Sequence, residues 1–104
     1  MYVEFLYFED CPSHDVALER LRQVMAEQAI DADVHIIRVE TEAEAEQYRF
    51  TGSPTIRVNG EDIAPLFDTT YGLACRAYRL EDGRISPLPS VQMIRQALKQ
   101  EAKQ

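Results

Sequence analysis

The stretch FEDCPSHDVALERL, residues 8–21, connects an apolar run to a helical pattern. It follows YVEFLYF, residues 2–8, which is almost continuously apolar, as expected for a strand that is covered on both faces. After Pro12, apolar residues recur at three- and four-residue spacing as far as Ala29. This periodicity predicts an amphipathic helix of about four to five turns. The stretch therefore predicts a strand that leads into a helix, with Cys11 at the junction.

The next part of the chain repeats the strand and helix pattern. VHIIRV, residues 34–39, is rich in β-branched residues and predicts a second strand. TEAEAEQYRF, residues 41–50, predicts a short acidic helix, because Thr41 and Glu44 stand at the spacing of a capping box. The first half of the chain is therefore expected to fold as β-α-β-α.

Two further strands and a helix are predicted in the second half. TIRV, residues 55–58, predicts a third strand that ends at the tight-turn dipeptide Asn59-Gly60. CRAYRL, residues 75–80, predicts a fourth strand that ends before Asp82-Gly83, and the final helix is expected to begin near Ser90. Between these strands lies a segment without a clear period, which predicts an ordered excursion over the surface.

The order β-α-β-α-β-β-α restricts the possible topologies. A right-handed β-α-β crossover, followed by an antiparallel pair and a closing helix, builds a four-stranded mixed sheet flanked by helices. With 104 residues, of which 45% are apolar, residues 1–104 are expected to form a single α/β domain around one core.

Composition and charge exclude several classes of partner. The formal net charge is -7 and the pI is about 4.7, whereas nucleic acids and anionic membranes are bound by clustered Lys and Arg. The N-terminal apolar run is short, is interrupted by Glu4 and has no basic flank, and no apolar stretch approaches membrane-spanning length. We therefore expect a cytoplasmic protein that does not bind nucleic acid or membranes.

The chain contains two cysteines, Cys11 and Cys75, which lie 64 positions apart. In a reducing compartment such a pair is expected to be free, catalytic or metal-binding rather than a structural disulfide. The sequence leaves open whether the two residues meet.

Two motifs together resemble the thioredoxin-like superfamily. C-P-x-x, residues 11–14, opens the first helix, and Gly52-Ser53-Pro54-Thr55 precedes the third strand. The segments FEDCPSHDVALERLR, TGSPTIRVNG, GLACRAYRLEDG and PSVQMIRQAL, which cover nearly the whole chain, further resemble a group of small bacterial thioredoxin-like proteins, the DF-type (seleno)proteins. The resemblance implies a thioredoxin-like fold, a cis Pro54 against the active thiol, and redox chemistry at Cys11, because some members carry selenocysteine at the matching position.

The residues around Cys11 are consistent with a reactive thiol. The thiolate is the nucleophilic form of cysteine, and a helix N-terminus favours negative charge. If Pro12 is the first helical residue, Cys11 is the N-cap, and an imidazolium at His14 lies within reach of the sulfur. The neighbouring carboxylates, among them Asp10 and Asp15, oppose the thiolate.

The motif departs from the dithiol pattern, because His14 stands where C-x-x-C thioredoxins carry their second cysteine. A two-cysteine cycle within this motif is therefore excluded. Resolution then comes either from glutathione or another thiol, or from Cys75. An antiparallel pairing of the third and fourth strands would place Cys75 on the order of 10 Å or more from Cys11, beyond disulfide reach, unless a bulge or a folded-back loop in residues 61–74 moves it.

We therefore predict a thiol-based redox protein that needs no cofactor or metal. It would be a thiol-disulfide oxidoreductase, a thiol peroxidase-like enzyme or a redox sensor, and the sequence leaves open which. Its partner would be a thiol or disulfide, either glutathione or a protein, and the chain would be a monomer or a homodimer. The predicted catalytic residues are Cys11, Pro12 and His14, the predicted substrate-binding residues are Ser53, Pro54 and Thr55, and Cys75 is a candidate resolving residue. The groove beside Cys11 would be lined by Tyr7, Phe8, Pro12, Pro54 and Tyr71.

Other interpretations stay open. Cys11 with Cys75 or His14 could hold a soft ion such as Hg, Cu(I) or As(III) in a binding or sensing module. The chain could also be a thioredoxin-like interaction scaffold, with Cys11 as an inert core residue. Cys75 is more simply a packed strand residue, and His35 alternates within a strand and is expected to be structural.

Overall fold

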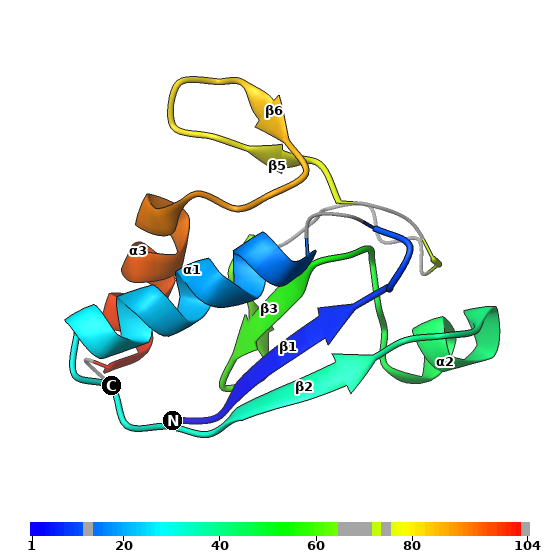
Figure 1. Ribbon diagram of the computed structural model, residues 1–104, viewed down its shortest axis with the longest axis horizontal. Helices are drawn as coiled ribbons and strands as arrows, with labels where there is room; N and C mark the ends of the chain where they lie inside the picture. Colours follow the sequence, from blue (N-terminus) through cyan, green and yellow to red (C-terminus); the bar gives the residue numbers. More distant parts are fainter. Residues whose placement is uncertain (12–13, 65–71, 74–75, 103–104) are drawn as a thin grey trace.

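The computed structural model of the protein describes residues 1–11, 14–64, 72–73 and 76–102. Its main element is a four-stranded sheet in the order β2-β1-β3-β4. The central strand β1 is parallel to β2 and antiparallel to β3, and β3 is antiparallel to β4. The strands are β1 (Val3–Tyr7), β2 (Val34–Arg38), β3 (Thr55–Val58) and β4 (Glu61–Asp62). The chain is therefore an α/β protein with a mixed sheet (Figure 1).

The helices lie on one face of this sheet and beyond the end of β2 (Figure 1). The longer helices, α1 (His14–Glu27) and α3 (Val91–Ala102), pack side by side on one face, whereas the short α2 (Glu42–Gln47) lies beyond the end of β2 (Figure 1). Because side chains alternate along a strand, Phe5 contributes to the core under α1 and α3, and Leu6 contributes to a second core with Ala45 of α2. The strand predicted to be covered on both faces is confirmed as β1.

The fourth strand of the sheet is not where the sequence predicts it. Instead of residues 75–80, it is β4, which follows directly after the Asn59-Gly60 turn. Both turn residues have a positive φ, 53° at Asn59 and 86° at Gly60, so the chain reverses at once and pairs Arg57 with Asp62. The prediction was wrong because Glu61–Asp62 carries no β-branched or aromatic residue that marks a strand.

Part of the predicted fourth strand instead belongs to a separate hairpin. β5 (Tyr78–Arg79) pairs with β6 (Ile85–Ser86) in a two-stranded sheet outside the main one (Figure 1). The turn between them contains Asp82, which accepts a hydrogen bond from the backbone of Arg84, and Gly83 with a φ of 89°. The turn at Asp82-Gly83 is confirmed, but the preceding strand is shorter than the predicted residues 75–80 and pairs with β6 instead of β3.

The helix starts agree with the sequence where the caps are described. Thr41 caps α2 by accepting a hydrogen bond from Glu44 N at 3.1 Å, which confirms the predicted start of this helix. Ser90 Oγ accepts a hydrogen bond from Met93 N at 3.1 Å, and α3 begins at the next residue. Within the described residues, no helix combines the length and apolar character needed to cross a membrane.

Candidate functional site

Cys11 lies in the turn that follows β1. Its backbone N–H donates to Phe8 O at 3.0 Å, and its side chain is only 1% exposed. The thiol donates to the carbonyl oxygen of Ser53, with 3.5 Å between Sγ and O. The antiparallel register of β1 and β3, in which Leu6 pairs with Thr55, explains why residues so distant in the sequence meet here. The structure therefore brings together the two motifs that the sequence singles out.

The turn before β3 is tightly packed. Ser53, Pro54 and Thr55 are all buried, and the Ser53–Pro54 peptide bond is cis. Thr55 Oγ1 donates to Gly52 O at 2.5 Å, and Gly52 has a φ of 138°. Ser53 Oγ is buried and makes no hydrogen bond to any residue that the structure describes. These residues therefore form an ordered wall beside the Cys11 sulfur rather than an exposed groove.

A segment from the second half of the chain packs against this turn. Arg76 N donates to Ser53 O at 2.9 Å, so the Ser53 carbonyl accepts from both the Cys11 thiol and this backbone amide. Two residues later, the hydroxyl of Tyr78 donates to Pro54 O. Burial raises the pKa of the Tyr78 phenol, which therefore keeps its proton for this bond at neutral pH. Sequence reasoning did not assign either residue to the site.

The Arg76 side chain is also buried, with 1% of it exposed. Its Nη1 lies 2.6 Å from Asp62 Oδ2, and its Nη2 donates to Ala64 O at 2.7 Å. The guanidinium lies over the Tyr78 ring, 4.5 Å from the ring centroid. Asp62 itself is held by a hydrogen bond from Ala64 N to its other oxygen. An ion pair at the edge of the sheet thus fixes the segment that contacts Ser53.

His14 is the first described residue of α1. Its ring stacks on Tyr7, with 4.6 Å between the ring centroids, and its Nδ1 lies 3.1 Å from a carboxylate oxygen of Asp15. These contacts place His14 against the last residue of β1, the strand that leads to Cys11. Tyr7, predicted to line the groove, therefore supports the His14 ring.

Some predicted residues fall elsewhere. Phe8 is half-buried and packs against the core under α2. Pro12, Tyr71 and Cys75 lie outside the described residues, so the N-cap position of Cys11 and the separation of Cys75 from Cys11 stay predictions. His35 is exposed and its ring lies 4.5 Å from that of Tyr2.

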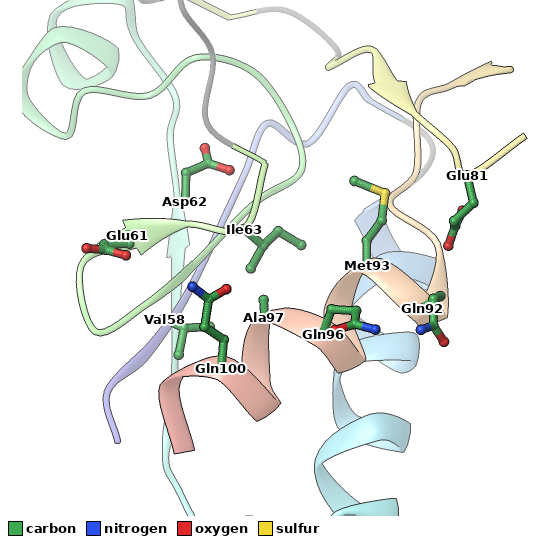
Figure 2. Close-up of a pocket in the computed structure, with 10 residues that line it drawn as sticks. All are labelled: Val58, Glu61, Asp62, Ile63, Glu81, Gln92, Met93, Gln96, Ala97 and Gln100. Atoms are coloured by element: carbon green, nitrogen blue, oxygen red, sulfur yellow. The ribbon is translucent and has the colours of Figure 1, made fainter. Parts of the chain in front are cut away.

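A cavity of about 400 Å³ lies between β4 and α3 (Figure 2). Its wall contains no cysteine or histidine, but it includes Asp62, the partner of Arg76. The lining residues are Val58, Glu61, Asp62, Ile63, Glu81, Gln92, Met93, Gln96, Ala97 and Gln100. Among the described residues, no three or more His, Cys, Asp or Glu side chains are grouped so that they could hold a metal ion.

Comparison with known protein families, with curated proteins and with solved structures found no match to this chain. The function of the chain is therefore inferred from the contacts of Cys11, Ser53 and Arg76.

Proposed function

We propose that the chain is a thioredoxin-like thiol redox protein in which Cys11 is the nucleophile. The observation that carries the proposal is the 3.5 Å contact between the Cys11 sulfur and the carbonyl of Ser53. The Cys11 thiol lies between the central strand β1 and the helix α1, and it faces the turn that precedes β3. It therefore has a defined orientation and a defined backbone partner. An inert core cysteine needs neither.

The thioredoxin-like topology is part of the proposal. It is supported by the crossover from β1 through α1 to the parallel β2, and by the antiparallel pair of β3 and β4. It is also supported by the closing helix α3, which packs against α1. In this arrangement the turn after β1 and the turn before β3 meet at Cys11 and Ser53.

The proposed chemistry uses a hydroperoxide or a disulfide as oxidant. With a hydroperoxide, the Cys11 thiolate attacks one peroxide oxygen, an S–O bond forms as the O–O bond breaks, and the alcohol or water leaves with a proton. A thiol such as glutathione then condenses with the sulfenic acid, which forms an S–S bond and releases water. With a disulfide, the thiolate forms the mixed disulfide directly and the other sulfur leaves as a thiolate. In both cases a second thiol regenerates Cys11.

The Ser53 carbonyl has a specific role in this cycle. It accepts a hydrogen bond from the S–H group, so the contact holds the thiol rather than the thiolate. When the proton leaves, two electron-rich atoms face each other, and the sulfur must turn away from the carbonyl. We propose that an imidazolium at His14, whose ring is oriented by Tyr7 and Asp15, stabilises the thiolate after this rotation.

Mass spectrometry of the intact protein and its peptides tests the proposal. Wild type, Cys11→Ser and Cys75→Ser are treated with mild peroxide or diamide. Oxidation or glutathionylation at Cys11 that persists in Cys75→Ser supports the proposal and a monothiol route. No reaction of native Cys11, together with full reaction in denaturant, would contradict it.

Cys75→Ser also tests the resolving thiol. Cys75 precedes Arg76, whose backbone N–H is bonded to the same carbonyl as the Cys11 thiol. A loss of two hydrogens in wild type, with a cross-linked peptide that is absent from both variants, would assign resolution to Cys75. The predicted separation of the two cysteines would then be wrong.

A further inference from the structure

We propose that the segment Arg76–Tyr78, called here the 76–78 segment, determines which oxidants reach Cys11. Its backbone occupies the Ser53 carbonyl, the acceptor to which an extended partner would hydrogen-bond. Cys11 in the folded protein therefore reacts with small oxidants. Bulky disulfides react only after the 76–78 segment moves away. The inference rests on the proposed function and adds a size limit to its substrate class.

The first support is the use of the Ser53 carbonyl. A carbonyl oxygen has two lone pairs, and here it accepts from Arg76 N at 2.9 Å and from Cys11 Sγ at 3.5 Å. Further along β3, the carbonyl of Ile56 accepts from Ile63 N at 3.0 Å. A peptide that pairs with the backbone beside Cys11 must therefore first displace Arg76.

The second support is that the 76–78 segment is anchored by its own side chains. The Tyr78 hydroxyl donates to Pro54 O, so the segment is attached to the same turn at both of its ends. The Arg76 guanidinium is attached to Asp62 and to Ala64 O. The contact with Ser53 is therefore part of a buried network and not an isolated backbone bond.

The third support is the burial of the sulfur. Cys11 is 1% exposed, and Ser53 and Thr55 are fully buried. Thiol–disulfide exchange brings the attacking sulfur up to a disulfide that carries a substituent on each side. A hydroperoxide of a few atoms requires much less space, so the closed site favours the small oxidant.

The test compares reagents of two sizes on one thiol. In the Cys75→Ser chain, Cys11 is the only cysteine, and its reaction is followed with hydrogen peroxide and with glutathione disulfide. Tyr78→Phe removes only the hydroxyl that bonds to Pro54. We expect the rate of reaction with glutathione disulfide to rise about five-fold, because loss of one ordinary hydrogen bond raises the population of the open state by about that factor. The rate of reaction with peroxide is expected to change less than about two-fold.

The matched control is Tyr48→Phe, a half-buried tyrosine on the α2 side of the sheet, which is expected to change neither rate. A second variant, Arg76→Lys, keeps the charge that faces Asp62 but loses the forked contact to Asp62 and Ala64. It is expected to raise the glutathione disulfide rate selectively, as Tyr78→Phe does.

The outcomes separate the two proposals. If Cys11 is oxidised by peroxide but both variants leave the ratio of the two rates unchanged, or raise both rates equally, the role of the 76–78 segment is wrong and the proposed function stands. If peroxide does not oxidise native Cys11 while the variants selectively admit glutathione disulfide, the segment controls access and the peroxide route is wrong. If neither reagent reacts with native Cys11 in any variant, both proposals fail.

Discussion

Arg76 carries a charge that is almost completely removed from water. Taking a guanidinium out of water costs several kcal/mol, and the nearby carboxylate of Asp62 offsets that cost. Because these two energies offset each other, the main effect of the ion pair is on the position of the chain and not on the net free energy of folding. It fixes where the chain turns toward Ser53, and a change of Asp62 alone would leave the buried guanidinium of Arg76 without its carboxylate.

We expect Arg76→Met to lower the free energy of unfolding by about 1.5–3 kcal/mol, because the half-buried Asp62 carboxylate would lose its charged hydrogen-bond partner. The matched control is Arg84→Met, in which the arginine side chain is 77% exposed and pairs with Asp82. Its loss is expected to cost about 0–1 kcal/mol. Urea denaturation measures both values, and similar losses in the two variants would show that the Arg76 pair is not a buried anchor.

At the scale of elements, local patterns predicted most helices and strands, and packing decided the rest. The N-cap of α2 was predictable because Thr41 and Glu44 contact within one turn. The short β4 was not, because Glu61 and Asp62 become a strand only through pairing with β3. Strand pairing of this kind leaves no periodic signal in two residues.

The two long helices are linked by an ion pair at the surface. Arg95 of α3 donates to both carboxylate oxygens of Glu27 at the end of α1, at 2.8 Å and 3.2 Å. The hydrogen bond from Arg95 lowers the pKa of Glu27. Because the pKa of Glu27 is lower in the folded state than in the unfolded state, the contact with Arg95 stabilises the fold at a pH above the unfolded-state pKa. This stabilisation is lost as the pH falls through the folded-state pKa.

Glu27→Gln is therefore expected to lower the melting temperature at pH 7, and this effect is expected to shrink toward about pH 2 as Glu27 takes up its proton. Glu19→Gln, at another exposed glutamate of α1, serves as the control and is expected to have little effect at either pH. Thermal melts followed by circular dichroism at the two pH values provide the measurement. A difference that persists unchanged at pH 2 would rule out the charge-dependent contact as its cause.

At the scale of the whole molecule, the site combines features that the sequence could and could not predict. The closeness of Cys11 and Ser53 was expected only from the resemblance of the two motifs to thioredoxin-like proteins, which implies that Pro54 lies against the thiol. The contribution of Arg76 was not expected. Arginine is rarely buried, and its partner Asp62 lies in a different element, so no local spacing links the two.

Stability is expected to be unequal across the molecule. The amides of β1 lie in the centre of the sheet between two apolar cores, whereas β5 and β6 form a separate hairpin (Figure 1). In native-state hydrogen exchange, the β1 amides should exchange only by global unfolding. The Leu80 amide, which donates to Arg84 O at 2.8 Å in the hairpin, should exchange by a smaller opening.

Hydrogen exchange measured over a series of low denaturant concentrations distinguishes a global opening from a local one. A global opening depends steeply on denaturant, and a local opening does not. If the Leu80 amide followed the same steep dependence as the amides of β1, the hairpin would be part of the global folding unit, and the 76–78 segment would not open independently.

The carbonyl group of Ser53, which accepts two hydrogen bonds, is also a spectroscopic probe of the site. Because it accepts from both the Cys11 thiol and the Arg76 amide, its electron density depends on two separate events. A ¹³C label at this one carbonyl would shift when the sulfur loses its proton and again when the arginine amide departs. One resonance would then record both the chemistry at the sulfur and the order in which the backbone rearranges.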